Sequence, residues 1–150
     1  MSAVLVIALC LAGCPQAKNP VVTTRATGTF EVKLTPQPIE GELLSRMTID
    51  KQFHGDLAGT SKGEMLAAGT AVQGSAGYVA IERVSGTLNG RTGTFALQHS
   101  GTLTRGEPAL VVTVVPDSGT GELVGLSGKM SIVIEGKKHR YTFDYSLAGS

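Results

Sequence analysis

The amino-acid sequence predicts an all-β domain of about eight short strands, arranged as an antiparallel barrel or sandwich. Three observations favour this class. Short runs of alternating apolar and polar residues recur along the chain, and clusters of Gly, Pro, Asp and Ser separate them at regular spacing. No stretch sustains the 3.6-residue period of an amphipathic helix. The 150 residues, among them 20 glycines, therefore fit one domain in which helices are minor.

The expected strands follow one another over most of the chain. Each is bounded by Gly, Pro or Asp/Ser clusters. They span residues 26–34, 44–55, 58–71, 75–88, 91–103, 109–115, 128–135 and 139–147. Because most of the connections are short, we expect hairpins between neighbouring strands.

One connection fixes the pairing of its two strands residue by residue. Asn89-Gly90 is the preferred pair for a two-residue type I′ turn, because both positions take positive φ. Since side chains alternate across a strand, the turn places one set of side chains on a common face. Glu82 and His99 are diagonal neighbours on this face, within reach through long side chains. The face comprises Tyr78, Ala80, Glu82, Val84, Phe95, Leu97 and His99.

Charged pairs indicate which face of each hairpin is the outer one. A two-residue turn at Gln73-Gly74 sets Glu64 opposite Arg83 on one face and Met65 opposite Glu82 on the other. Directly opposed ions cost little on a wet surface. The face that carries Met65 and Glu82 is therefore predicted to point inward.

The last hairpin, with its turn at Gly136-Lys137, shows the same separation. Lys129 lies opposite Asp144 on one face. Two hairpins thus each divide an ion-paired face from an aromatic one, and the aromatic faces are predicted to form the interior. In this hairpin the aromatic face comprises Met130, Ile132, Ile134, His139, Tyr141, Phe143 and Tyr145.

An interior of this composition is typical of a small-molecule pocket, because apolar walls surround a few convergent polar groups. Glu82 and His99 are the candidate catalytic residues. Burial raises the pKa of a glutamate and a neighbouring imidazolium lowers it, so the balance can place proton transfer near neutral pH. The candidate ligand-binding residues are Tyr78, Phe95, Met65, Met130, Tyr141, Phe143 and Tyr145.

Three functions from different classes remain open at this point. The first is a binding module that holds a small, partly apolar molecule in its lumen. The second is an isomerase or cyclase in which Glu82 or His99 moves a proton. The third is a filled barrel that serves as a structural or interaction module, with the two groups as a buried polar pair that fixes the register.

Composition and spacing argue against several other functions. A net charge of +1 without a long Lys/Arg run argues against nucleic-acid binding, which needs clustered basic residues. His54, His99 and His139 lie on different predicted strands without a close-spaced ligand pair, so no metal site is predicted, and no cofactor is expected. The G-x-S-x-G match at residues 59–63 lacks the strand-to-helix turn of a nucleophile elbow.

The first residues of the chain have the pattern of an export signal. Residues 1–14, MSAVLVIALCLAGC, contain about a dozen apolar and small residues, too few to span a bilayer as a helix. No Lys or Arg precedes the apolar run, in contrast to a typical signal. The ending Leu11-Ala12-Gly13-Cys14 resembles the lipobox of bacterial lipoproteins, which implies cleavage before Cys14 and its lipidation. The expected organisation is a signal peptide at 1–13, a tether at 14–25 and a barrel domain at 26–148.

This organisation implies an address for the protein. We expect a domain outside the cytoplasm, in the bacterial cell envelope, that contacts the membrane through its lipid anchor only. With Cys10 removed in the leader and Cys14 lipidated, the mature domain has no free thiol and no disulfide.

Two kinds of segment resemble known families. Residues 115–128, VPDSGTGELVGLSG, are similar to the glycine-rich loop of allene oxide cyclase and dirigent proteins. The stretches GSAGYVAIERVSGTLNGRTGTFALQHSGTL and HRYTFDYSL resemble a bacterial family of unassigned function related to that barrel. The resemblance covers residues 26–148 and implies an eight-stranded, calycin-like antiparallel barrel, but no activity.

Only the glycine-rich loop of this chain is matched to a specific segment of the allene oxide cyclase and dirigent proteins. The glycine-rich loop is expected to be a tight connection that glycines with positive φ permit. Relatives of this barrel are often trimeric, and a homo-oligomer is left open for this chain.

Overall fold

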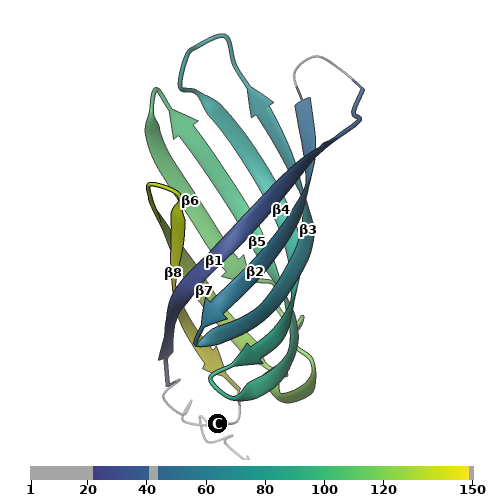
Figure 1. The fold of residues 1–150 in the computed structure, drawn as a ribbon, viewed down its shortest axis with the longest axis vertical. Coiled ribbons are helices and arrows are strands. Elements are labelled where there is room, and N and C mark those ends of the chain that lie inside the picture. Colours follow the sequence, from purple (N-terminus) through teal and green to yellow (C-terminus); the bar gives the residue numbers. More distant parts are fainter. Residues whose placement is uncertain (1–21, 41–43, 149–150) are drawn as a thin grey trace, which may run out of the picture.

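Eight antiparallel strands close into a barrel in which each strand pairs with the next and β8 pairs with β1 (Figure 1). The structure is a computed structural model, and it describes residues 22–40 and 44–148. This architecture confirms the predicted all-β, eight-stranded antiparallel barrel. The elements are β1 (Thr24–Gln37), β2 (Leu44–Gly55), β3 (Leu57–Gly69), β4 (Ala76–Leu88), β5 (Arg91–Thr104), β6 (Glu107–Val114), the short 3₁₀ helix η1 (Gly121–Leu123), β7 (Leu126–Glu135) and β8 (Lys138–Leu147).

The β4–β5 hairpin has the predicted turn and register. Asn89 and Gly90 have φ values of 45° and 83°, the left-handed conformations that a type I′ turn requires. Leu88 pairs with Arg91 and Ala80 with His99. The turn chemistry of two residues therefore sets the position of every side chain on both strands.

The β7–β8 hairpin is also in the predicted register. Its strands are joined at Gly136-Lys137, and Lys129 lies opposite Asp144. The ion pair of Asp144, however, is with Arg25 on β1, at 2.7 Å. The outer face thus carries the charges, as expected, but the partner comes from the other neighbouring strand.

The β3–β4 connection differs from the predicted two-residue turn. Residues 70–75 form the connection, and the Thr70 hydroxyl lies within hydrogen-bond distance of the carbonyls of Val72 and Ser75. The register is shifted by two residues, so that Met65 faces Ala80 rather than Glu82. Because a shift of two preserves the alternation, every side chain keeps its predicted face.

The expected ion pair between Glu64 and Arg83 is therefore wrong. Glu64 faces Ile81 and accepts two hydrogen bonds from Arg46 of β2, at 2.7 and 2.8 Å. Arg83 donates instead to the Thr94 hydroxyl at 2.9 Å. The charged surface is still the outer one, which is the point on which the prediction of sidedness depends.

One end of the barrel is filled with side chains. We call it the closed end; it carries the Asn89-Gly90 turn and the glycine-rich loop. Aromatic rings stack across its interior, with Phe95 and Phe143 at 5.9 Å and Phe143 and Tyr145 at 5.3 Å between centroids. Leu57, Leu88 and Leu123 are fully buried in the same core. The opposite, open end carries the connections at residues 70–75, 105–106 and 136–137.

The glycine-rich loop folds along the closed end and continues the pairing of β5. The Thr94 amide donates to the Thr120 hydroxyl at 3.1 Å, and the Thr92 amide donates to the Glu122 carboxylate at 2.8 Å. Gly121 and Gly125 have φ values of 61° and 79°. These conformations confirm the prediction of a tight connection that glycine permits.

Strand β1 begins at Thr24 rather than at the predicted Ala26, because Thr24 already pairs with Tyr145 of β8. The predicted signal peptide at 1–13 and the lipidation site at Cys14 lie outside the described residues, as does most of the predicted tether at 14–25. Within the described ranges, no helix is long and apolar enough to cross a membrane.

Candidate functional site

Four polar side chains meet inside the barrel. Glu82 of β4 lies at the centre and is fully buried, with Lys51 of β2, Ser61 of β3 and His99 of β5 buried around it. The four come from adjacent strands, and their positions in the registers place all of them on the inner face. Glu82 and His99 therefore lie inside the barrel, as the hairpin register predicts.

The carboxylate of Glu82 accepts three hydrogen bonds. Lys51 Nζ lies 2.7 Å from Oε1, His99 Nε2 lies 2.8 Å from Oε1, and Ser61 Oγ lies 2.5 Å from Oε2. Strands β3 and β4 approach each other closely at Gly63, where a Cβ atom would overlap the backbone of Glu82. This close approach brings the groups together. We call Lys51, Ser61, Glu82 and His99 the buried cluster.

The contacts hold Glu82 in its ionised form. Burial by itself raises the pKa of the carboxyl group, but the hydrogen bond from His99 and the charge of Lys51 together lower the pKa of Glu82 to about 2. Since the carboxylate has no proton at neutral pH, His99 Nε2 donates in their hydrogen bond. The Lys51 ammonium also lies over the ring of Phe30, 4.8 Å from its centroid, where the ring face attracts a cation.

A cavity of about 260 Å³ lies between the buried cluster and the open end. Lys51 and His99 form part of its lining. Most of the other lining groups are apolar; they include Phe30, Val32, Ile49, Met65, Ala80 and Ile132.

Tyr78 lines the same cavity. Partial burial and the negative charge of Glu82 raise the pKa of the Tyr78 phenol, so this side chain is neutral at physiological pH. A Cβ atom at Gly101 would overlap the Tyr78 ring. Glycine at that position therefore lets the ring lie against β5.

The structure divides the predicted site residues into two groups. Met65, Tyr78 and His99 line the cavity, and Glu82 lies next to it through its bonds to Lys51 and His99. The other predicted ligand-binding residues belong to the packed core and do not line the cavity. They are Phe95, Met130, Tyr141, Phe143 and Tyr145.

The two core tyrosines have structural partners at the closed end. The Tyr141 hydroxyl accepts a hydrogen bond from the Leu57 amide at 2.9 Å, and the Tyr145 hydroxyl accepts one from the Asn89 side chain at 2.9 Å. All five core residues point inward, as predicted, but they lie too far toward the closed end to reach the cavity.

Two residues of the buried cluster are absent from the sequence-based prediction. Lys51 stands between Ile49 and Phe53 in the alternating pattern of β2, so a period-two count places it on the inner, apolar face. That signal was sufficient to find it. Ser61 has no comparable signal, because a small hydroxyl residue is common on either face of a strand.

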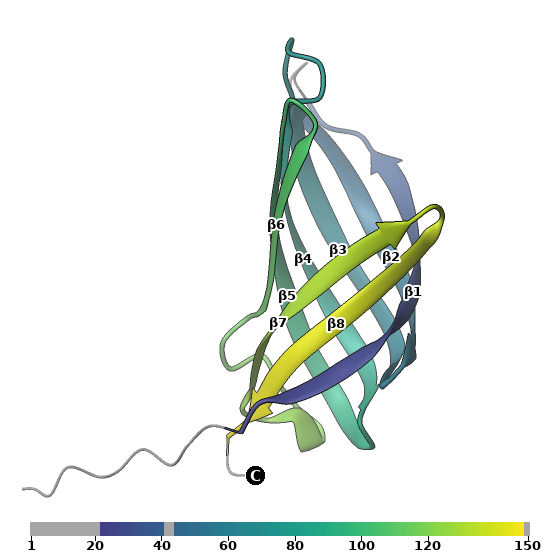
Figure 2. The same ribbon diagram turned by 90° about the vertical axis from the view of Figure 1, so that its left-hand side faces the viewer.

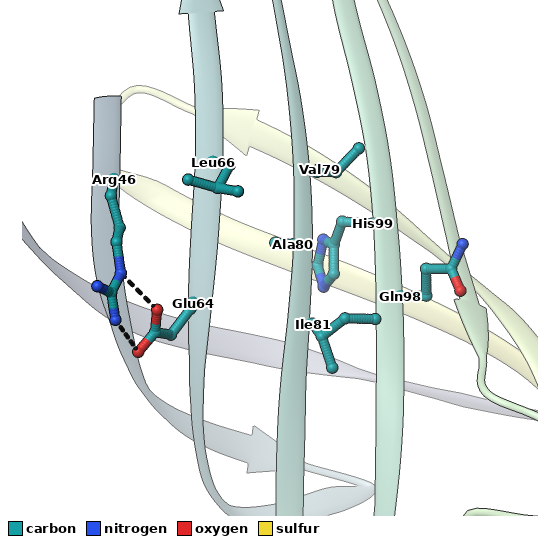
Figure 3. A pocket seen from close by; sticks show the side chains of 8 residues that line it. All are labelled: Arg46, Glu64, Leu66, Val79, Ala80, Ile81, Gln98 and His99. Atoms are coloured by element: carbon teal, nitrogen blue, oxygen red, sulfur yellow. Dashed lines mark hydrogen bonds and ion pairs between the residues drawn. The ribbon is translucent and has the colours of Figure 1, made fainter. Parts of the chain in front are cut away.

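A larger hollow, of about 560 Å³, is lined mainly by outward-facing side chains of β2 to β5, together with the buried Ala80 and His99. Figure 3 shows the Arg46–Glu64 pair and Leu66 beside it. The ion pair here is exposed to solvent, so these charges are neither desolvated nor aimed at an enclosed space. We therefore place the candidate site in the smaller interior cavity, which buried charges line.

The three histidines have different contacts, although His99 and His139 both line the cavity. His54 is exposed and pairs with Glu31 at 3.0 Å, and His139 stacks on Phe30 with 5.0 Å between ring centroids. Among residues 22–40 and 44–148, no group of three or more His, Cys, Asp or Glu side chains is placed to hold a metal ion.

The fold and the site together define a class: a small antiparallel barrel with an apolar cavity above a buried, ion-paired cluster. The chain belongs to the DUF3224 family of proteins of unknown function, whose model matches residues 26–145. It is similar to the crystal structure of a DUF3224 protein with unknown function from Shewanella oneidensis MR-1. The two are 50% identical, the match covers 86% of this chain and 100% of the other, and the TM-score is 0.83.

No curated protein matches the chain. The resemblance of the glycine-rich loop to allene oxide cyclase and dirigent proteins stays a prediction, since the family membership assigns no activity and no ligand.

Proposed function

We propose that the barrel binds a small, partly apolar molecule in the cavity at its open end. The observation that carries this proposal is the composition of the cavity: its walls are apolar, and Lys51 and His99 supply polar groups. Ligand sites commonly combine apolar walls with a few placed polar groups in volumes of about 300–1,000 Å³. A cavity of about 260 Å³ therefore favours a small ligand.

An isomerase or cyclase that uses Glu82 as acid or base is less well supported. A general acid or base works best when its pKa is near the operating pH. The pKa of Glu82 is lowered to about 2, and both carboxylate oxygens accept hydrogen bonds inside the protein. Glu82 thus suits the role of a fixed negative charge that orients Lys51 and His99.

A filled barrel that serves only as an interaction module accounts for the closed end. It gives no reason for an apolar cavity beside a buried lysine at the other end. The binding function accounts for both features.

The direct test fills the cavity with a larger side chain. Ile132 lines the cavity, whereas Val133, its neighbour on β7, is exposed on the outer face. We expect Ile132→Trp to abolish the fluorescence enhancement of anilinonaphthalene sulfonate and Val133→Trp to preserve it. Met65→Trp, with Leu66→Trp as its exposed control, repeats the test on β3. Equal dye binding by the inward and outward variants, with circular dichroism showing folded barrels, would overturn the proposal.

We propose further that Cys14 carries a lipid that anchors the domain in the bacterial envelope. Support comes from the apolar run and the Leu11-Ala12-Gly13-Cys14 sequence. Metabolic labelling with an alkyne fatty acid should tag the wild-type chain and not Cys14→Ala, and the variant should leave the membrane fraction. An unlabelled wild-type chain that stays with the cytoplasmic proteins would contradict the anchor.

A further inference from the structure

The barrel wall is weakly closed between β6 and β7. In the part of the chain that the structure describes, the register between these strands consists of one pair, Thr113 with Lys129. The neighbouring β7–β8 ladder, in contrast, runs from Leu126 to Glu135. Beyond the single pair, β6 and the β7–β8 hairpin diverge toward the open end, as Figure 2 shows. We call this part of the wall the lateral opening.

Cavity-lining side chains lie on both sides of the lateral opening. Leu110 of β6 and Ile132 and Ile134 of β7 line the cavity. By register, Leu110 faces Gly101 and Ile134 faces His139, so both belong to the inner face. Yet Leu110 is 40% exposed and Ile134 is 63% exposed. The cavity is therefore partly open to solvent along apolar side chains of β6 and β7.

The part of the cavity lining next to the buried cluster contains a positively charged group, Lys51. Among the residues that the structure describes, the titratable groups that line the cavity are Lys51, Tyr78, His99 and His139, and none of the lining side chains is acidic. The Glu82 carboxylate lies behind Lys51 and His99, with both oxygens bonded to the cluster. An ammonium group has three donors, of which Lys51 gives one to Glu82. A ligand here therefore meets a cation and an imidazole but no exposed carboxylate.

We propose that the ligand is a straight-chain monocarboxylate, with its head at Lys51 and its tail in the lateral opening. This inference rests on the proposed binding function and specifies the ligand class. The Lys51 ammonium has N–H donors beyond the one that it gives to Glu82, and a ligand carboxylate can accept from them. Hydrogen bonds between ions are stronger than those between neutral groups. The apolar path between Leu110 and Ile134 suits an unbranched chain.

Head-group recognition is tested by calorimetric titration with octanoate and 1-octanol, which differ at the head alone. We expect octanoate to bind wild-type protein at least tenfold more tightly than the alcohol. Lys51→Met should remove this preference, whereas Lys62→Met, at an exposed position on β3, should keep it. Equal affinity for acid and alcohol in wild-type protein would overturn the head-group assignment, whatever the stability of the variants.

Two outcomes of the titrations distinguish a wrong head-group assignment from the absence of ligand binding in the cavity. If acid and alcohol bind equally and Ile132→Trp abolishes both, the cavity is a binding site without the proposed head-group selectivity. If neither probe binds and the dye test also fails, the binding function itself falls.

Tail placement is tested by chain length. We expect affinity to rise at least tenfold from hexanoate to dodecanoate in wild-type protein. Leu110→Trp should remove the gain for dodecanoate and leave hexanoate binding intact, because it blocks the lateral opening. Val111→Trp, at the exposed outward neighbour, should behave as wild type. The same length dependence in both variants, or none in the wild type, would contradict the route through the wall.

Discussion

Glu82 determines the electrostatics of the interior. Its carboxylate is fully buried and accepts hydrogen bonds from Lys51, Ser61 and His99. A buried charge is tolerated when it is paired and its hydrogen-bonding capacity is met. Glu82 therefore serves to keep a lysine and a histidine inside an otherwise apolar barrel.

Removing the charge of Glu82 should be costly, because it leaves the Lys51 ammonium buried without its counter-ion. We expect Glu82→Gln to lower the free energy of unfolding by roughly 3–5 kcal/mol. The double variant Glu82→Gln with Lys51→Met should recover part of this loss, since it removes both charges. Urea denaturation measures the free energy of unfolding of the wild type, the single variant and the double variant. The control Glu64→Gln breaks an exposed pair and should cost about 1 kcal/mol or less; a Glu82→Gln protein as stable as this control would contradict the account.

The same residue predicts how stability depends on acid pH. The pKa of Glu82 is about 2 in the folded protein and 4.5 as the ordinary value, so ionised Glu82 stabilises the fold above pH 4.5. This contribution, at most about 3 kcal/mol at 1.36 kcal/mol per unit, is lost as the pH falls from 4.5 toward 2. Melting temperatures between pH 6 and pH 2 should therefore fall more steeply for wild type than for Glu82→Gln. Parallel curves would show that the carboxylate contributes nothing.

At the scale of elements, turn chemistry determined what the sequence could predict. Asn89-Gly90 specifies a single turn type, so it fixed the β4–β5 register and the inward position of Glu82. Gln73-Gly74 does not, because Gly74 belongs to a longer loop that Thr70 organises. The resulting shift of two residues changed every cross-strand partner but no face.

Alternation along a strand gives the side on which a residue lies but not its depth along the barrel axis. For this reason Phe143 and Tyr145 were predicted to be inside, where they are, and also to bind ligand, although they lie at the closed end. Depth depends on strand tilt and on the stagger of all eight strands, which no single hairpin contains. The inward position of Lys51 follows from the alternation of its own strand, β2, and not from the charged pairs of the hairpins.

The glycine-rich loop should be essential to the closed end. Leu123 is fully buried in the core, whereas the adjacent Val124 is exposed. Leu123→Ala should destabilise the barrel by about 2–5 kcal/mol, because it leaves a cavity in a packed region. Val124→Ala should change the free energy of unfolding by about 0.5 kcal/mol or less. Chemical denaturation compares the two, and similar losses would mean that the loop does not pack as described.

The whole molecule combines a packed closed end with a cavity toward the open end. Aromatic rings and leucines fill the closed end, and the buried cluster separates this core from the cavity. Lys51 and Glu82 are paired with each other and His99 is bonded to Glu82, so these groups form a fixed polar region beside the cavity. This division of a packed core from a lined cavity is the basis of the proposed binding function.

Methyl resonances of the methionines test that function most directly. Met65 lines the cavity and Met130 is buried in the core, so one protein contains both a reporter and its control. In a titration of ¹³C-methyl-methionine protein with octanoate, we predict that the Met65 resonance shifts in a saturable manner and that Met130 is unaffected. A saturable shift absent from Met65, or equal shifts at both residues, would contradict binding in the cavity.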